Sequence, residues 1–152
     1  MKHGIRSDGF AVWLRQLPDS VAVAKITVRI DRLCRGNPGE VKRVGGGVNQ
    51  MRVDHGPGYR VYFAEDRDQI IIILANGTTS AQAVDIVKAK RLVKTLKTKT
   101  KTAPYETSEF LRTPDLLLAY MDEALDTKDA AFIAHALAVV VRAKKINRDS
   151  VK

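Results

Sequence analysis

Apolar residues recur at helical spacing in the first part of the chain. Their pattern predicts one amphipathic helix that ends before Pro18 and a second helix that Asp19 or Ser20 can cap. The Gly-Asn-Pro-Gly sequence at residues 36–39 is typical of a turn and closes this helical hairpin. The apolar positions are Phe10, Trp13, Leu14 and Leu17 in the first helix, and Val23, Ile26, Ile30 and Leu33 in the second.

The hydrophobic period then shortens to that of strands. Four strands are predicted at residues 41–44, 48–54, 59–64 and 69–74, joined by turns of hairpin length. Residues 70–74 are apolar on both faces, so we expect their strand to be central and covered. A third helix follows, which Ser80 can cap. It is expected to direct Ala83, Ile86, Val87 and Val93 inward and Lys88, Lys90, Arg91 and Lys94 outward.

Two further helices are predicted in the last third of the chain. Thr113 and Pro114 form a helix start, and Asp129 can cap the final helix. Helices of this length bury little alone, so we expect them to pack against the preceding part of the chain. Their predicted inward positions are Leu117, Tyr120, Met121, Ala124 and Leu125, then Ile133, Ala136, Leu137 and Val140.

Composition and charge limit what the protein can be. The 152 residues are 45% apolar, which suits one domain or a small domain with an appendage. A net charge of +9 favours a polyanionic partner, with nucleic acid ahead of membrane. The lone Cys34 excludes an intramolecular disulfide and a cysteine-rich zinc site. The first residues lack a signal-peptide core, and no apolar run could span a bilayer, so a cytoplasmic location is expected.

The charge is divided along the chain. Residues 1–95 carry +7, whereas residues 105–129 carry −5. A basic run at residues 88–101 separates them and contains seven Lys or Arg and no acid. We therefore predict a basic body at residues 1–95, a Lys/Thr-rich linker at 96–104 and a helical segment at 105–152.

Strand alternation groups polar residues on one face of the predicted sheet. If Arg52 faces Arg60 across the turn at residues 55–58, then Gln50 faces Tyr62, and all four point the same way. Two opposed arginines repel each other, and a phosphate between them would relieve the repulsion. The alternative is that each arginine pairs with a nearby carboxylate, for which Asp54, Glu40 and Glu65 are the candidates.

The motifs of the body resemble those of RelE/ParE-superfamily toxins, specifically the HigB-like "addiction module killer" branch. The resemblance covers residues 5–93 and rests on FxVWLxxL, KIxxRIxRL, GNPGEVKRVGGGV, HGPGYRVYF, IIIIL and SAQAVDI. It implies an α+β fold in which a helical hairpin packs on a small antiparallel sheet and a helix follows. It also implies a ribosome-dependent mRNA endonuclease that works without a cofactor.

RNA cleavage without a metal needs a base for the 2′-hydroxyl, cations for the phosphorane and an acid for the leaving oxygen. No carboxylate cluster suited to Mg²⁺ stands out, so this route is favoured. The candidate catalytic residues are Lys42, Arg52, His55, Arg60 and Tyr62. Two departures weaken the match to active toxins, because the family usually has Lys at the position of Thr79 and Glu at that of Gln50. Gln82 and Asp85 are kept.

Residues 103–146 resemble the beginning of the partner antitoxin, which is normally a separate helix-turn-helix protein. TAPYETSEFL and RAKKI carry this resemblance. After RAKKI, six residues cannot complete a recognition helix, so we expect weak DNA binding without sequence preference.

The chain thus resembles a toxin fused to part of its antitoxin. The second segment is expected to inhibit the body within one chain or in a swapped homodimer. The expected contact residues are Leu117, Tyr120, Met121 and Leu125. Two alternatives stay open: a nucleic-acid-binding or regulatory module whose active site has decayed, and a gyrase-inhibiting toxin of the ParE kind.

Overall fold

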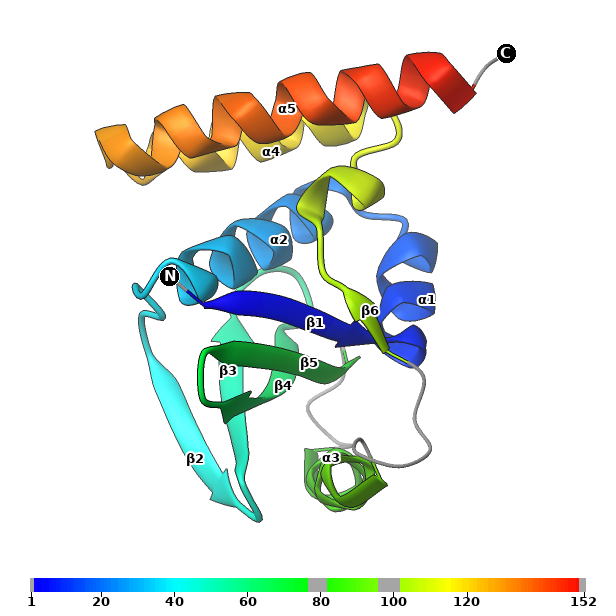
Figure 1. Ribbon diagram of the computed structural model, residues 1–152, viewed down its shortest axis with the longest axis vertical. Coiled ribbons are helices and arrows are strands. Elements are labelled where there is room, and N and C mark those ends of the chain that lie inside the picture. Colours follow the sequence, from blue (N-terminus) through cyan, green and yellow to red (C-terminus); the bar gives the residue numbers. More distant parts are fainter. Residues whose placement is uncertain (1, 77–81, 96–101, 151–152) are drawn as a thin grey trace.

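The computed structural model describes residues 2–76, 82–95 and 102–150 and has an α+β fold (Figure 1). A six-stranded sheet has the order β2-β3-β4-β5-β1-β6. The strands are β1 (His3–Ser7), β2 (Val41–Gly45), β3 (Val48–Val53), β4 (Tyr59–Asp66), β5 (Gln69–Asn76) and β6 (Thr102–Pro104). The helices are α1 (Asp8–Gln16), α2 (Ser20–Cys34), α3 (Gln82–Thr95), the 3-10 helix η1 (Thr107–Phe110), α4 (Pro114–Asp126) and α5 (Ala130–Ser150).

The four predicted strands are confirmed as the antiparallel series β2 to β5. β5 is also central, as its apolar sequence predicted, because β1 pairs with its other edge. β1 was not predicted. It pairs in parallel with β5, with Ile5 opposite Ile71, and the sheet is therefore mixed rather than purely antiparallel.

The helical hairpin covers one face of the sheet. Ser7 caps α1 by accepting from the Phe10 amide, and Asp19 caps α2 by accepting from the amides of Val21 and Ala22. Pro18 lies between the helices, as predicted. Their apolar faces pack on alternate residues of the strands. This core includes Phe10, Leu14, Val23, Ile26, Ile30, Leu33, Met51, Val53, Val61, Phe63, Ile70 and Ile72.

Helix α3 packs on the opposite face, and its predicted orientation is confirmed in part. Ile86 and Val93 pack toward the sheet, and Lys88, Arg91 and Lys94 are exposed, as predicted. Asp85 and Ala89 are its buried residues, and Ala89 packs in a cluster with Tyr62. Ala83 and Val87, which we expected inside, are exposed, Val87 by 56%. Periodicity therefore identified the helix and part of its inner side, but Ala83 and Val87 were assigned to that side wrongly because apolar residues are spread around the helix. The expected cap Ser80 lies outside the described residues.

Part of the predicted linker belongs to the sheet. Thr102–Pro104 forms β6, which pairs antiparallel with β1 and places Ala103 opposite Arg6. The next residues continue into the main core, where Tyr105 stacks on Phe110 and both contact Phe10. Residues 96–101 lie outside the described part of the chain.

Helices α4 and α5 form a layer on the outer side of α2 (Figure 1). The predicted start of α4 is confirmed, since the Thr113 hydroxyl accepts from the Leu116 amide and Pro114 is the first helical residue. Asp129 accepts from the Phe132 amide at the start of α5. The buried residues of this layer include Tyr120, Ala124, Phe132, Ala136 and Ala143. Leu137 was expected inside but is 53% exposed, and Phe132 is buried instead.

None of the helices in the described ranges combines the length and the apolar character needed to cross a membrane.

Candidate functional site

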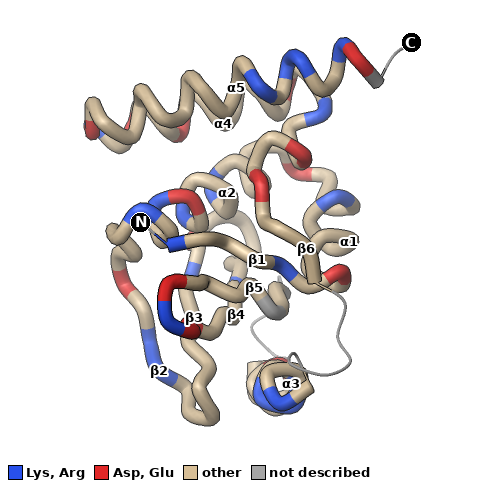
Figure 2. Tube along the Cα trace, in the orientation of Figure 1, with Lys and Arg blue, Asp and Glu red and all other residues tan. Residues whose placement is uncertain are grey.

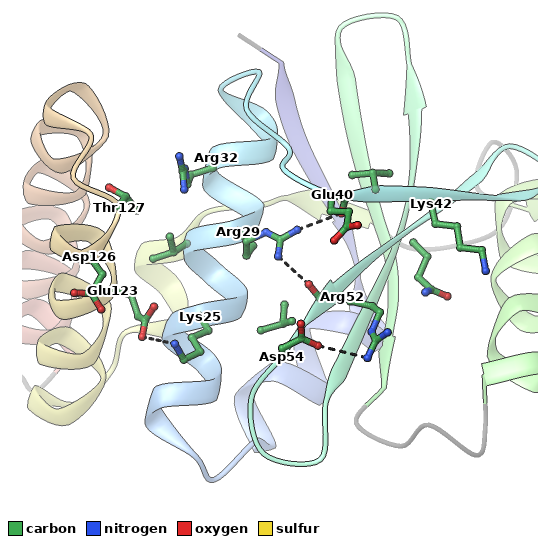
Figure 3. Close-up of a pocket in the computed structure, with 14 residues that line it drawn as sticks. Lys25, Arg29, Arg32, Glu40, Lys42, Arg52, Asp54, Glu123, Asp126 and Thr127 are labelled. Atoms are coloured by element: carbon green, nitrogen blue, oxygen red, sulfur yellow. Dashed lines mark hydrogen bonds and ion pairs between the residues drawn. The ribbon is translucent and has the colours of Figure 1, made fainter.

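A cavity of about 750 Å³ lies between α2, the β2–β3 edge of the sheet and α4 (Figure 3). Helix α2 supplies cations to one wall, β2 and β3 supply polar residues to the second, and the end of α4 supplies two carboxylates to the third. The charged residues of its lining are Lys25, Arg29, Arg32, Glu40, Lys42, Arg52, Asp54, Glu123 and Asp126.

The α2 wall follows from helical spacing. Lys25, Arg29 and Arg32 lie at i, i+4 and i+7 and therefore share one face of the helix. Arg29 also joins the walls, because its guanidinium donates to the backbone carbonyl of Arg52 at 2.8 Å and to that of Glu40 at 3.4 Å. Sequence reasoning did not select these cations, although their spacing would have identified them as one stripe.

Two predicted site residues, Lys42 and Arg52, are exposed and line this cavity. Lys42 pairs with Gln50 in the β2–β3 register, so Lys42, Gln50 and Arg52 project from the same face of the sheet. The Arg52 guanidinium lies 3.5 Å from the Asp54 carboxylate. A phosphate is therefore not required to balance Arg52, and the carboxylate pairing considered from the sequence is the one observed.

The other two strand residues lie beneath α3. The predicted register is confirmed, with Arg52 opposite Arg60 and Gln50 opposite Tyr62. Arg60 is only 9% exposed, however, so the expectation of a phosphate held between two accessible arginines is wrong for Arg60. Tyr62 is fully buried beside Asp85, and burial, with the nearby carboxylate, raises the pKa of its hydroxyl. Strand alternation predicted that these side chains share one face of the sheet, but it could not predict that α3 covers that face.

This buried region is polar. Gln82 of α3 donates to the Gln50 side-chain carbonyl at 3.0 Å, which ties the helix to β3. Within the described part of the chain, the Tyr62 hydroxyl and one oxygen of Asp85 have no hydrogen-bond partner. Burying a polar group without a hydrogen bond costs free energy, so the packing of α3 on this polar face of the sheet is less favourable than packing on an apolar face.

His55 lies apart from the cavity lining. Its Nε2 is 2.9 Å from Oδ2 of Asp19, the residue that caps α2. This hydrogen bond is the main reason that the pKa of Asp19 is lowered. The five predicted catalytic residues therefore occupy three places: Lys42 and Arg52 line the cavity, Arg60 and Tyr62 lie under α3, and His55 is held at the start of α2.

A buried hydrogen-bond network joins α2 to the C-terminal segment, and sequence reasoning missed it. The two carboxylate oxygens of Asp31 accept from the Thr107 hydroxyl at 2.7 Å and the Tyr120 hydroxyl at 2.6 Å. Tyr105 and Thr107 are joined by a further hydrogen bond of 2.8 Å between their hydroxyls. Burial raises the pKa of Asp31 to about 6, although both hydroxyl bonds favour the charged form. The available signal was that Asp31 is the one acid of α2, a helix whose other charged residues are the cations Lys25, Arg29 and Arg32.

The four predicted neutralising residues differ in their positions. Tyr120 is fully buried at the contact with α2. Leu117 and Met121 are partly buried and line a groove with Val140 of α5. Leu125 is 52% exposed, so its assignment to the contact was wrong. The predicted apolar stripe of α4 is wider than its contact with α2, because Tyr120 and Ala124 are buried there while Leu125 lies outside the contact.

Charged residues of the C-terminal segment also bind the body. Glu123 of α4 lies 2.8 Å from Lys25 of α2. Glu109 is 3.3 Å from both Arg6 of β1 and Arg15 of α1. Among the described residues, no three His, Cys, Asp or Glu side chains are grouped so that they could hold a metal ion.

Comparison with known proteins shows that the chain has a relative in Haemophilus influenzae. The chain is 42% identical over 87 residues to a Haemophilus influenzae protein described as "Uncharacterized protein". The match spans 57% of this chain and 88% of the Haemophilus protein. No family model and no solved structure matches the chain. At this identity and coverage, the chain belongs to the same family as the uncharacterized Haemophilus protein.

Proposed function

We propose that residues 1–112 form an RNA-cleaving toxin of the RelE/ParE kind and that α4 and α5 are an antitoxin-derived layer that silences it. Three features support this proposal. The sequence motifs resemble both partners of such a pair, the fold joins a helical hairpin to a sheet, and a cation-lined cavity lies beside the predicted strand residues.

The charge of the cavity carries the proposal. Five Lys or Arg and four Asp or Glu line it, and two of the four acids, Glu123 and Asp126, come from α4. Without α4, the lining would hold five cations against Glu40 and Asp54, an environment that favours a phosphodiester. Helix α4 therefore brings negative charge to the place where RNA phosphates would bind.

The proposed chemistry begins with Lys42 and Arg52, which are the exposed predicted residues in the cavity. Their charges would bind the scissile phosphate and stabilise the negative charge of the phosphorane. Arg60 and Tyr62 share this face of the sheet but are buried under α3, so α3 would have to move before they could contact the RNA. In this proposal mRNA on the ribosome is the substrate.

The contact between the two parts resembles a stable interface more than a tether. Tyr120 is buried against α2, and Ala24 and Val28 of α2 pack in the same apolar cluster as Ala124. Because α4 packs on α2 of its own chain here, we propose inhibition within one chain rather than by exchange between two chains.

The test is expression of a chain that ends after Arg112. This boundary keeps β6, Tyr105 and Phe110, which complete the sheet and the core, and removes α4 and α5. We expect growth arrest with loss of cellular mRNA, whereas the intact chain should be tolerated. The same truncated chain carrying Lys42→Gln and Arg52→Gln should be harmless. Three results would contradict the proposal: a truncated chain that leaves growth unchanged, a Lys42→Gln, Arg52→Gln variant that is still toxic, or an intact chain that is toxic.

A second candidate function is RNA binding without cleavage. The separation of His55 from the cavity, and the burial of Arg60 and Tyr62, favour this alternative. It predicts that the chain ending after Arg112 binds RNA through Lys42 and Arg52 but leaves growth and mRNA unchanged.

A further inference from the structure

Helix α3 presents a basic surface to solvent. Lys88, Arg91 and Lys94 are exposed and lie at i, i+3 and i+6, about 4.5 Å apart along the helix axis. None of the three forms an ion pair or hydrogen bond with another described residue. We call these three residues the α3 basic surface. Three cations on one short helix, without a charged partner among the residues that the structure describes, favour an extended polyanion.

The α3 basic surface continues toward the candidate site. Lys90, the next cation of α3, lies over the β2–β3 turn, where a Cβ added to Gly46 would come within 2.9 Å of the Lys90 Cγ. Beyond this turn, Lys42 and Arg43 are exposed on the edge strand β2. Lys42 also lines the cavity, so cations follow one another from the cavity across the sheet edge to α3.

Helix α4, which carries the acidic residues of the cavity, does not cover this surface. In Figure 1, α3 and the pair α4 and α5 lie at opposite ends of the molecule, and Figure 2 shows the blue of Lys and Arg on α3. The acidic residues of α4 instead reach the cavity and α2. The fold therefore separates a cationic surface that α4 neutralises from one that it leaves open.

We propose that the α3 basic surface binds the phosphate backbone of RNA, and that the intact chain keeps this binding while α4 neutralises the cations of its cavity. The choice of RNA rests on the proposed function, because the surface leads to the cavity where RNA would react. Phosphate contacts carry no base information, so the binding is independent of sequence and depends strongly on salt.

The experiment measures the affinity of the intact chain for a short single-stranded RNA of mixed sequence across a series of salt concentrations. The test variant carries Lys88→Gln, Arg91→Gln and Lys94→Gln, which preserve helix propensity. The matched control carries Lys144→Gln, Lys145→Gln and Arg148→Gln, three exposed cations of α5, and loses the same charge. Far-UV circular dichroism and thermal unfolding establish that all three proteins are folded.

We expect the α3 variant to lose at least about tenfold in affinity near physiological salt and the α5 control to lose much less. The slope of log affinity against log salt should fall by about 2 for three lost contacts. Equal losses in the two variants would overturn the proposal, because net charge alone would explain them. Tighter binding to a DNA duplex or to anionic lipid vesicles than to the RNA would also overturn it.

This result is distinguishable from the test of the proposed function. If the chain ending after Arg112 is not toxic but RNA binding still depends on α3, the proposed function fails and the α3 surface stands. If that chain is toxic and α3 makes no difference to binding, the α3 surface fails and the proposed function stands.

Discussion

The C-terminal third of the chain contacts the body in two different ways. Residues 102–111 are part of the body itself, since β6 extends the sheet and Tyr105 and Phe110 fill the main core. Helices α4 and α5 instead lie outside α2 and form their own apolar cluster. Both stretches resemble an antitoxin in sequence, yet the first completes a fold and the second covers one.

The difference indicates where the proposed inhibitor would begin. Removing α4 and α5 exposes one side of α2 and frees Asp31 from Tyr120, but it leaves the sheet and its core intact. Removing residues 102–111 as well would strip an edge strand and two core aromatics. The structural boundary between the body and α4 therefore lies near Arg112 and not in the predicted linker at residues 96–104.

The largest expected effect tests the first contact. Phe110→Ala removes a core ring that packs edge-on against Phe10. The free energy of unfolding should fall by about 3–5 kcal/mol in urea denaturation. Leu118→Ala, at a residue that is 64% exposed on α4, is the control and should change it by less than about 0.5 kcal/mol. Similar small losses in both variants would show that residues 102–111 are not part of the core.

The next effect is the pH dependence of Asp31. Its pKa is raised from 3.8 to about 6 in the folded protein, so between these values the folded state binds more protons than the unfolded state. Stability should therefore fall as the pH rises through this window and level off above it, by an amount on the order of 2–3 kcal/mol. Urea denaturation of the wild type and Asp31→Asn across the window measures this. A variant that keeps the full pH dependence would rule out Asp31 as its source.

Tyr120→Phe probes the same network through its donor. The substitution keeps the ring but removes the hydroxyl that donates to Asp31, which leaves one buried carboxylate oxygen without this bond. We expect a loss of about 1–3 kcal/mol in the unfolding of the intact chain. In the chain ending after Arg112, Tyr120 is absent, and Asp31→Asn should cost less there than in the intact chain. If Asp31→Asn lowers the free energy of unfolding equally in the two chains, Asp31 stabilises the body without any contribution from Tyr120.

The smallest effect concerns Lys25 and Glu123 at the edge of the cavity. Both side chains are partly exposed, so Glu123→Gln should reduce stability by less than about 1 kcal/mol, and less still at high salt. The same substitution should raise the affinity for RNA, since it removes negative charge from the cavity, and this change should be larger than the change in stability. Filter binding measures the RNA affinities of the wild type and the variant. If RNA affinity at low salt is unchanged, the negative charge of α4 does not act on the site that binds RNA phosphates.

Sequence patterns predicted the helices, strands and caps better than they predicted which elements pack together and which side chains are buried. The caps Asp19 and Thr113 and the register of Arg52 with Arg60 depend on neighbouring residues and are confirmed. β1 was missed because its parallel partner β5 lies more than sixty residues away in the chain. The burial of Arg60 depends on where α3 packs, and that is set by tertiary contacts across the sheet.

The same reasoning applies to the candidate site. Lys42 and Arg52 could be selected because strand alternation and a family motif both point to them. The α2 cations and the α4 carboxylates come together only when α4 docks on α2, which no local pattern encodes. Asp31 likewise acquires its role from Thr107 and Tyr120, far along the chain.

The most direct test of silencing by α4 uses the intact chain with Tyr120→Ala, which removes a buried ring and the hydrogen bond to Asp31 at the α2 contact. Leu118→Ala, an exposed position of the same helix, is the matched control. Growth and the lifetime of cellular mRNA are measured after induction of each protein. The account predicts that Tyr120→Ala slows growth and shortens mRNA lifetime while Leu118→Ala does neither. If both folded variants leave growth and mRNA unchanged while the chain ending after Arg112 is toxic, α4 does not silence the body through this contact.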